Sequence, residues 1–126
     1  MQHVVGGYMN IYLVIFITLI AALIASFSQL TYKKGIKSKL NGIGDMLLLL
    51  KNRLIIMGVL GYLASLVVYL YALSNAPLSI VYPTFASTFI FITIISAVYL
   101  HEPMSAGRVA GVAFIFLGIL FIAATL

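Results

Sequence analysis

The sequence contains two carboxylates, Glu102 and Asp45, and no cysteine. Glu102 lies in the segment YLHEPMS between two apolar blocks, so it is the first residue to consider for acid–base chemistry in a membrane. A carboxylate that couples transport to protons must be partly buried, because burial raises its pKa toward neutrality. Pro103 follows Glu102 directly and disfavours the helical conformation there. We therefore expect Glu102 to lie in a short turn at the membrane surface, near the N-terminus of the next helix, and not to couple protons.

Other reactive groups are equally sparse. His101 stands beside Glu102, but one histidine without a second ligand nearby makes no metal site. The sequence has no nucleophile paired with a base, no cluster of metal ligands and no phosphate-binding loop. We therefore expect neither an enzyme nor a protein that carries a metal or an organic cofactor.

The composition is that of an integral membrane protein. Hydrophobic residues make up 64% of the 126 residues and charged residues 7%, and the mean hydropathy is +1.24. A bilayer is crossed by a helix of roughly 20 apolar residues, and the chain has several such runs. The net charge of +5 lies beside these runs, which indicates membrane topology and not binding to nucleic acid.

The apolar runs predict an all-α membrane protein, a bundle of four transmembrane helices that forms a single transmembrane domain over residues 1–126. The predicted helices cover about residues 10–32, 54–74, 79–100 and 105–126. Between the first two, residues 46–50 are apolar but too few to cross the bilayer, so we expect a short interfacial helix there. The other two connections, NAPLS and HEPMS, are tight turns that contain proline.

The basic residues are distributed unevenly between the two ends of the predicted helices. All seven fall on one side of the membrane, in the loop between the first two helices and after the turn at Glu102: Lys33, Lys34, Lys37, Lys39, Lys51, Arg53 and Arg108. Basic loops are retained in the cytoplasm. We therefore expect a protein of the cell (plasma or inner) membrane with a cytoplasmic loop over 33–53, both termini outside and one fixed orientation.

The polar residues of the first helix could form a binding site. Gln29 precedes Lys33 by one turn, and Ser26 lies roughly on the same face together with small alanines, so a groove could open there. The alternative is that Gln29 only bonds to a neighbouring helix. Lys33 and Arg108 would stand at the cytoplasmic mouth, where they could attract a phosphate or serve topology alone.

The third helix and two tyrosines of the second supply further candidates. Pro83 loosens the third helix near its outer end, and loosened helix ends often line transport sites, although a first-turn proline can also be harmless. Tyr62 and Tyr69 are one heptad apart on the second helix and lie deep enough to line a path. The candidates for substrate contact are therefore Ser26, Gln29, Lys33, Tyr62, Tyr69, Tyr82, Pro83, Thr84, Ser87 and Arg108.

Three segments carry a family resemblance: SQLTYKKG at 28–35, ALSNAPLSIVYPTFAS at 72–87 and HEPMSAGRVAGVAFIFLGILFI at 101–122. In this order and spacing they resemble the four-helix members of the drug/metabolite transporter superfamily, the EamA and small multidrug resistance-like proteins. The nearest resemblance is to the small subunits of the flippase for undecaprenyl-phosphate-linked aminoarabinose. It implies a four-helix bundle that works as a dimer or as half of a larger transporter, with a small or lipid-linked organic substrate.

The sequence also departs from the superfamily pattern. Small multidrug exporters carry a glutamate in the first helix, where this chain has Leu23, and a tryptophan in the third, whereas this chain has none. Proton-driven export of aromatic cations is therefore not expected, although the lipid-linked sugar flippases do not depend on that glutamate. We expect a flippase or flippase subunit for a polyprenyl-phosphate sugar. The alternatives are an exporter of a small metabolite or drug, and a non-transporting partner subunit of a membrane glycosyltransferase.

The expected partners follow from the same arguments. They are membrane lipids, a lipid-linked or small organic substrate, and either a second copy of this chain or a related four-helix chain. Gly107 and Gly111 of the fourth helix are small enough to allow close contact with another helix.

Overall fold

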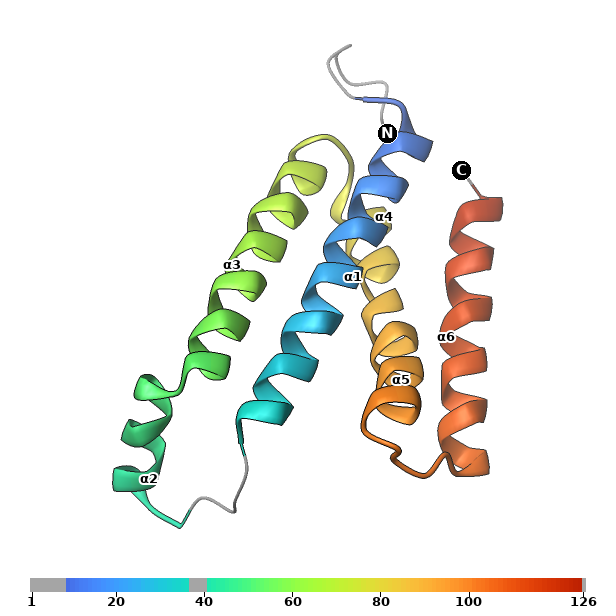
Figure 1. Ribbon diagram of the computed structural model, residues 1–126. Coiled ribbons are helices and arrows are strands. Elements are labelled where there is room, and N and C mark those ends of the chain that lie inside the picture. Colours follow the sequence, from blue (N-terminus) through green and yellow to red (C-terminus); the bar gives the residue numbers. More distant parts are fainter. Residues whose placement is uncertain (1–8, 37–40, 126) are drawn as a thin grey trace.

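The computed structural model describes residues 9–36 and 41–125, and within these ranges the chain is helical and contains no strand. The elements are α1 (Ile11–Gly35), α2 (Ile43–Leu48), η1 (Leu49–Lys51), α3 (Arg53–Ser74), α4 (Leu78–Phe85), α5 (Ser87–Tyr99) and α6 (Ala106–Ala124) (Figure 1). Four segments are long and apolar enough to cross a membrane: α1, α3, α4 together with α5, and α6. The predicted fold class, an all-α membrane protein with four spanning helices, is confirmed.

Three spanning helices begin at a polar residue whose side chain caps the first turn. The side-chain oxygens of Asn10 and Asn52 each accept a hydrogen bond of 2.9 Å from the backbone N–H two residues later. The Ser105 hydroxyl accepts one of 3.2 Å from the N–H of Arg108. Such caps satisfy N–H groups that have no partner within the helix. They fix where α1, α3 and α6 begin.

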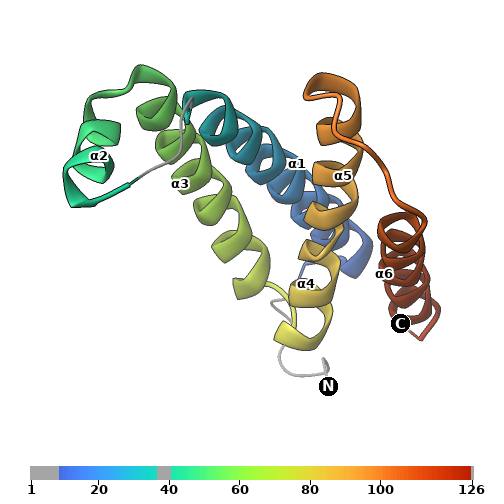
Figure 2. The ribbon, with the colours of Figure 1, turned by 90° about the horizontal axis from the view of Figure 1, so that it is seen from below.

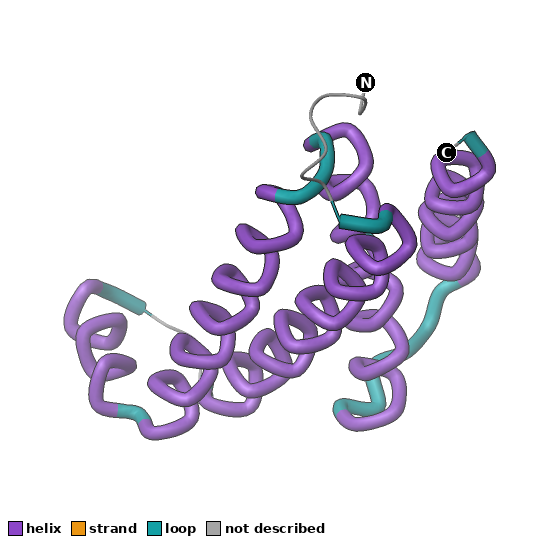
Figure 3. The backbone as a smooth tube through the Cα atoms, turned by 90° about the horizontal axis from the view of Figure 1, so that it is seen from above, coloured by secondary structure: helices purple, strands orange, loops and turns teal. Residues whose placement is uncertain are grey.

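Helix α1 is the central element of the bundle. It packs against α3 on one side and against α4 and α5 on another, whereas the main contacts of α6 are with α4 and α5. The views along the bundle show α6 standing at the edge, on the side away from α3 (Figures 2 and 3). The burial follows this order, because eight residues of α1 are buried and none of α6 is. Within one chain, α6 therefore presents most of its apolar surface outward.

The third spanning segment is two helices where the sequence predicted one helix over 79–100. Pro83 has no N–H to donate, so the carbonyl of Ser79, four residues earlier, lacks its usual helical donor and the segment is weakened within α4. Helix α4 ends at Phe85, and the N–H of Ala86 is shared between the carbonyls of Tyr82 and Pro83, at 3.2 and 3.0 Å. Helix α5 then begins at Ser87. The interruption follows Phe85, seven residues after the segment starts at Leu78, and so lies inside the spanning segment.

The predicted short helix between the first two spans is present as α2 and η1. It projects away from the bundle near the lower end of α3 (Figure 1). Its large apolar side chains are exposed, among them Ile43 at 76% and Leu50 at 68%. Such a segment gains free energy by placing these side chains in the acyl region beside the head groups. Its position relative to a membrane stays a prediction.

Candidate functional site

A partly open cavity of about 220 Å³ lies between α1 and α5, at the end of the bundle where α1 finishes. Nine residues line it. Helix α1 supplies Ser26, Gln29, Leu30 and Lys33; α5 supplies Ile92, Ile95 and Ser96; Leu100 and Glu102 follow α5. The part of the lining from α5 is mostly apolar, whereas α1 and the turn after α5 supply most of the polar and charged groups.

The four residues from α1 form one continuous helical face. They occupy positions i, i+3, i+4 and i+7, which lie above one another on a helix. Ser26, at the inner end, is 1% exposed, and its hydroxyl lies 2.7 Å from the carbonyl of Ala22 and 3.4 Å from that of Thr88 on α5. Lys33 is exposed and lies seven residues after Ser26, which is about 10 Å along the axis of α1 at a rise of about 1.5 Å per residue. The face thus runs from a buried hydroxyl to an exposed ammonium group.

The turn after α5 places Glu102 at the cavity. His101 has a φ of 54°, in the left-handed region that residues with a Cβ seldom adopt. The backbone N–H of Glu102 donates to the carbonyl of Ser96 at 3.2 Å, so the chain folds back over the end of the helix. The sequence predicted Glu102 in a turn, and it is in one. Its lining of a cavity shared with Lys33 was not foreseen.

The left-handed backbone at His101 leads to a stability prediction. A residue with a Cβ costs roughly 1 kcal/mol more than glycine in this region. His101→Gly should therefore stabilise the protein by up to about 1 kcal/mol, whereas His101→Ala retains the Cβ and should not. Thermal unfolding of the purified variants in detergent measures both. Equal melting temperatures for the glycine and alanine variants would show that the turn is not strained.

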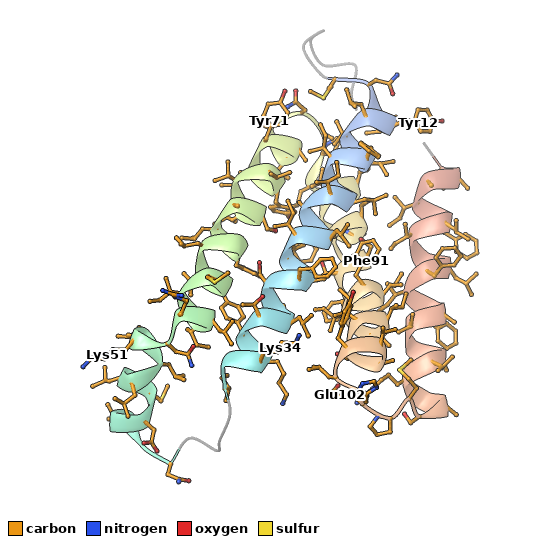
Figure 4. The ribbon with its side chains drawn as sticks, in the orientation of Figure 1. Tyr12, Lys34, Lys51, Tyr71, Phe91 and Glu102 are labelled. Carbon is orange, nitrogen blue, oxygen red and sulfur yellow. The ribbon has the colours of Figure 1, made fainter. Side chains whose placement is uncertain are left out.

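Two other cations near this end are engaged elsewhere. The Nζ atom of Lys34 lies 5.8 Å from the centroid of the Tyr99 ring, within range of a cation–π interaction that joins the ends of α1 and α5. Arg108 donates from its guanidinium to the carbonyl of Pro103 at 3.2 Å and does not line the cavity. Figure 4 shows Lys34 and Glu102 at this end of the bundle and Tyr12 and Tyr71 at the opposite end. Lys33 is the basic residue in the cavity wall.

The structure separates the remaining predicted site residues from this cavity. The Tyr62 ring faces Tyr32 at 6.5 Å between centroids, and the Tyr69 ring packs on Phe85 at 4.8 Å. Tyr82 is 64% exposed. None of these tyrosines lines the cavity, and neither do Pro83, Thr84 or Ser87. The cavity therefore brings together three of the ten predicted residues: Ser26, Gln29 and Lys33.

Thr84 and Ser87 are buried polar residues beside the break between α4 and α5. Thr84 is 2% exposed, and its hydroxyl donates to the carbonyl of Ile80 at 2.7 Å. Ser87 is 4% exposed, and its hydroxyl has no partner. Ser87 is the first residue of α5, directly after the break. Its unpaired hydroxyl therefore lies where α4 and α5 meet.

Ser96 and Glu102 are cavity residues that the sequence did not indicate as substrate contacts. Ser96 is a single polar residue in an apolar run, and its position one turn after Ile92 is the signal that could have identified it. Glu102 depends on the turn geometry at His101, which the sequence does not reveal. No group of three histidine, aspartate or glutamate side chains able to hold a metal occurs in the part of the chain that the structure describes.

Comparison with known proteins identifies the family. The sequence model described as the EamA-like transporter family matches residues 1–124. The chain belongs to this family. As a member of the EamA-like transporter family with four apolar helices of spanning length, it is a multi-pass membrane protein. No solved structure matches the chain significantly.

Curated relatives narrow the resemblance within the family. The chain is 36% identical over 61 residues to proteins named "Probable 4-amino-4-deoxy-L-arabinose-phosphoundecaprenol flippase subunit ArnE" from Escherichia coli strain K12 / DH10B and from Shigella boydii serotype 18. The match covers 48% of this chain and 55% of each relative. The chain thus spans about half the length of the curated relatives it matches. The resemblance to EamA-family proteins and to these flippase subunits is confirmed.

Proposed function

We propose that this EamA-family transporter is a flippase, or a subunit of one, for a sugar linked to a polyprenyl phosphate. The observation that carries the proposal is the cavity between α1 and α5, which combines an apolar wall at Ile92 and Ile95 with Lys33 at its exposed end. An apolar wall suits a lipid chain, and a lysine attracts a phosphate. The similarity to flippase subunits for a phosphoundecaprenol-linked sugar supports the same substrate class.

The size of the cavity supports action together with a second chain. Ligand pockets usually measure about 300–1,000 Å³, and this cavity of about 220 Å³ is smaller. Alternating access in related architectures uses two repeats that rock about a shared site. We therefore propose that a second four-helix chain, identical or related, completes the site. The word "subunit" in the names of the relatives agrees with this proposal.

We propose that the basic end of the bundle faces the cytoplasm. Lys33, Lys34 and Arg108 lie at the end where α1 finishes and α6 begins, while α1 begins and α6 finishes at the other end (Figure 1). This asymmetry is the one that the positive-inside rule relates to the cytoplasmic side. The cavity would then open toward the cytoplasm, where a newly made lipid-linked sugar is available for transport outward.

The orientation is tested by labelling single cysteines in a chain that has none of its own. In intact cells, a membrane-impermeant maleimide should label Ser74→Cys and leave Asn41→Cys unlabelled until the membrane is permeabilised. Both positions are exposed, so access depends on the side of the membrane. Labelling of Asn41→Cys from outside would reverse the proposed topology.

The function itself is tested with purified protein in liposomes that contain a fluorescent undecaprenyl-phosphate sugar in both leaflets. An impermeant quencher removes about half of the total fluorescence in protein-free liposomes, because it reaches only the outer leaflet. Any further loss of fluorescence in liposomes that contain the protein measures flipping from the inner leaflet. We expect flipping with the wild type and a reduction of at least about tenfold with Lys33→Glu, which places a second anion at the phosphate. Lys51→Glu, which lies outside the cavity, is the control. Wild-type protein that does not flip alone or with a co-expressed related chain would favour the non-transporting partner subunit.

A further inference from the structure

The segment formed by α2 and η1 carries an apolar stripe that the bundle leaves exposed. Four of its residues are spaced i, i+3, i+4 and i+7, so they lie roughly on one side of the segment: Ile43, Met46, Leu47 and Leu50. Their exposed fractions are 76%, 57%, 58% and 68%. Figure 1 shows the segment standing apart from the spanning helices. The apolar stripe is therefore free to contact a surface outside the chain.

Asn52 attaches this segment to the ends of two spanning helices. Its side-chain N–H donates to the carbonyl of Gly35, the last residue of α1, at 2.8 Å. Its side-chain oxygen accepts from the N–H of Leu54, in the first turn of α3, at 2.9 Å. A Cβ atom added at Gly35 would lie 3.2 Å from Cβ of Leu54, so the two helix ends are in close contact. The segment is thus held where two apolar spans end, which is the depth of the lipid head groups.

Two cations follow the apolar stripe, and the two carboxylates of the chain are engaged elsewhere. Lys51 ends η1 and Arg53 begins α3; both are exposed, and Lys51 points away from the bundle (Figure 4). Asp45 accepts a hydrogen bond from the N–H of Asn41 at 3.1 Å, and Glu102 lines the cavity between α1 and α5. The segment therefore offers apolar side chains and positive charge at the depth where a lipid has its acyl chains and its phosphate.

We infer that α2, η1 and the start of α3 form a binding site for anionic phospholipids, with the apolar stripe in the acyl region and Lys51 and Arg53 at the lipid phosphates. A zwitterionic lipid brings a cation together with its phosphate, so it gains less from two basic side chains than a lipid with a net negative charge. A partner protein could also cover apolar side chains, but the depth set by Asn52 places lipid against the stripe. The inference goes beyond the proposed function, because it concerns the outer surface of the bundle whatever the cavity transports.

Tryptophan fluorescence can measure which lipids contact the stripe, because the chain contains no tryptophan of its own. Leu47→Trp places one indole in the stripe of the full-length protein, which is reconstituted into bilayers with equal amounts of phosphatidylglycerol and phosphatidylcholine. Bromine on the acyl chains of a lipid quenches an indole in contact with it. Bilayers in which one lipid or the other is brominated therefore give the relative affinity of the two. Each basic residue contributes about fivefold near an anionic surface, so we expect a preference for phosphatidylglycerol of at least about tenfold.

Variants of the Leu47→Trp protein test the two cations. Arg53→Gln should lower the preference about fivefold, and Lys51→Gln combined with Arg53→Gln should remove most of it. Arg108→Gln is the matched control, because it removes the same charge at the same end of the bundle but away from the segment, and it should keep the preference. Melting temperatures in detergent verify that each variant is folded, and Leu50→Trp is a second reporter if Leu47→Trp is unstable.

The outcomes either support the lipid site or overturn it. Equal quenching by the two brominated lipids, or a preference that survives in the double variant, overturns the site for anionic lipids. An indole that aqueous acrylamide quenches and neither lipid quenches would place the segment in water. Protection from acrylamide and from both lipids would show that a protein, such as a second copy of the chain, covers the stripe; either result overturns the inference. Lys51→Glu should lose lipid preference and still flip lipid-linked sugars, so the surface and the cavity are tested separately.

Discussion

Leucine in place of Gly58 is expected to separate α1 from α3 and to destabilise the protein by about 1–3 kcal/mol, as overpacking a close contact does. A Cβ atom at Gly58 would lie 2.7 Å from Cδ1 of Tyr32 and 3.2 Å from the backbone oxygen of Ser28. The tyrosine ring could turn away, but the backbone of α1 cannot move without disturbing its other neighbours. Helix α1 packs against three elements, so a shift of α1 would disturb the packing of the whole bundle.

The interface between α1 and α3 around Gly58 is closely packed. One turn further along α3, a Cβ atom at Gly61 would lie 2.5 Å from the Ser28 hydroxyl oxygen. One more turn along, Ser65 is 1% exposed, and its hydroxyl donates to the carbonyl of Ala21 on α1 at 2.8 Å. Small residues on both helices allow this close approach, which drives helix association where lipid removes the usual hydrophobic gain. A leucine has no space to occupy here.

A matched substitution in α2, outside the surface expected to meet a second copy, provides the control. Nothing lies within 4 Å of a Cβ atom added at Gly44, so Gly44→Leu should leave the melting temperature of the protein in detergent nearly unchanged. Gly58→Leu should lower it strongly or give protein that elutes as aggregate in size-exclusion chromatography. Equal melting temperatures for Gly58→Leu and the wild type would contradict the packing of α1 against α3.

The glycines illustrate how far the sequence could predict the packing. The spacing of Gly107 and Gly111 predicted a close helix contact, yet within one chain a Cβ atom at either would meet nothing within 4 Å. The glycines in close contact are on α3, at positions 58 and 61. A stripe of small residues shows that a helix can be approached closely, but it does not say which neighbour does so, because that depends on the arrangement of the whole bundle.

Local sequence determines the positions of the helices more completely than it determines the residues of the cavity. The spans follow from the length of the apolar runs, and their starts from polar capping residues such as Ser105. The face of α1 at the cavity follows from helical spacing, so Ser26, Gln29 and Lys33 could be grouped in advance. Glu102 could not, because its position depends on one left-handed residue and on a hydrogen bond to Ser96. The geometry of such a turn is not encoded in a periodic pattern.

Cysteines near the end of α6 that carries Arg108 are expected to crosslink two copies of this chain in parallel. All of the basic residues lie on one side of the predicted topology, and each resists translocation across the membrane. A single sequence with this bias should insert in one orientation, so two copies that associate must point the same way. Helix α6 has no buried residue within one chain, and its glycines leave space for a neighbour. It is therefore the surface that we expect to meet the second copy.

Oxidation of Ala106→Cys in native membranes should give a disulfide-linked dimer, because a parallel pair brings the two thiols together at the same end of α6. In an antiparallel pair they would lie about 30 Å apart across the bilayer. Co-expression of Ala106→Cys with Ala124→Cys provides the control, because only an antiparallel pair places position 106 of one chain beside position 124 of the other. A mixed dimer of these two variants would contradict the charge argument. A parallel dimer would instead mean that any inverted arrangement of two halves requires a related chain whose basic residues lie at the opposite end.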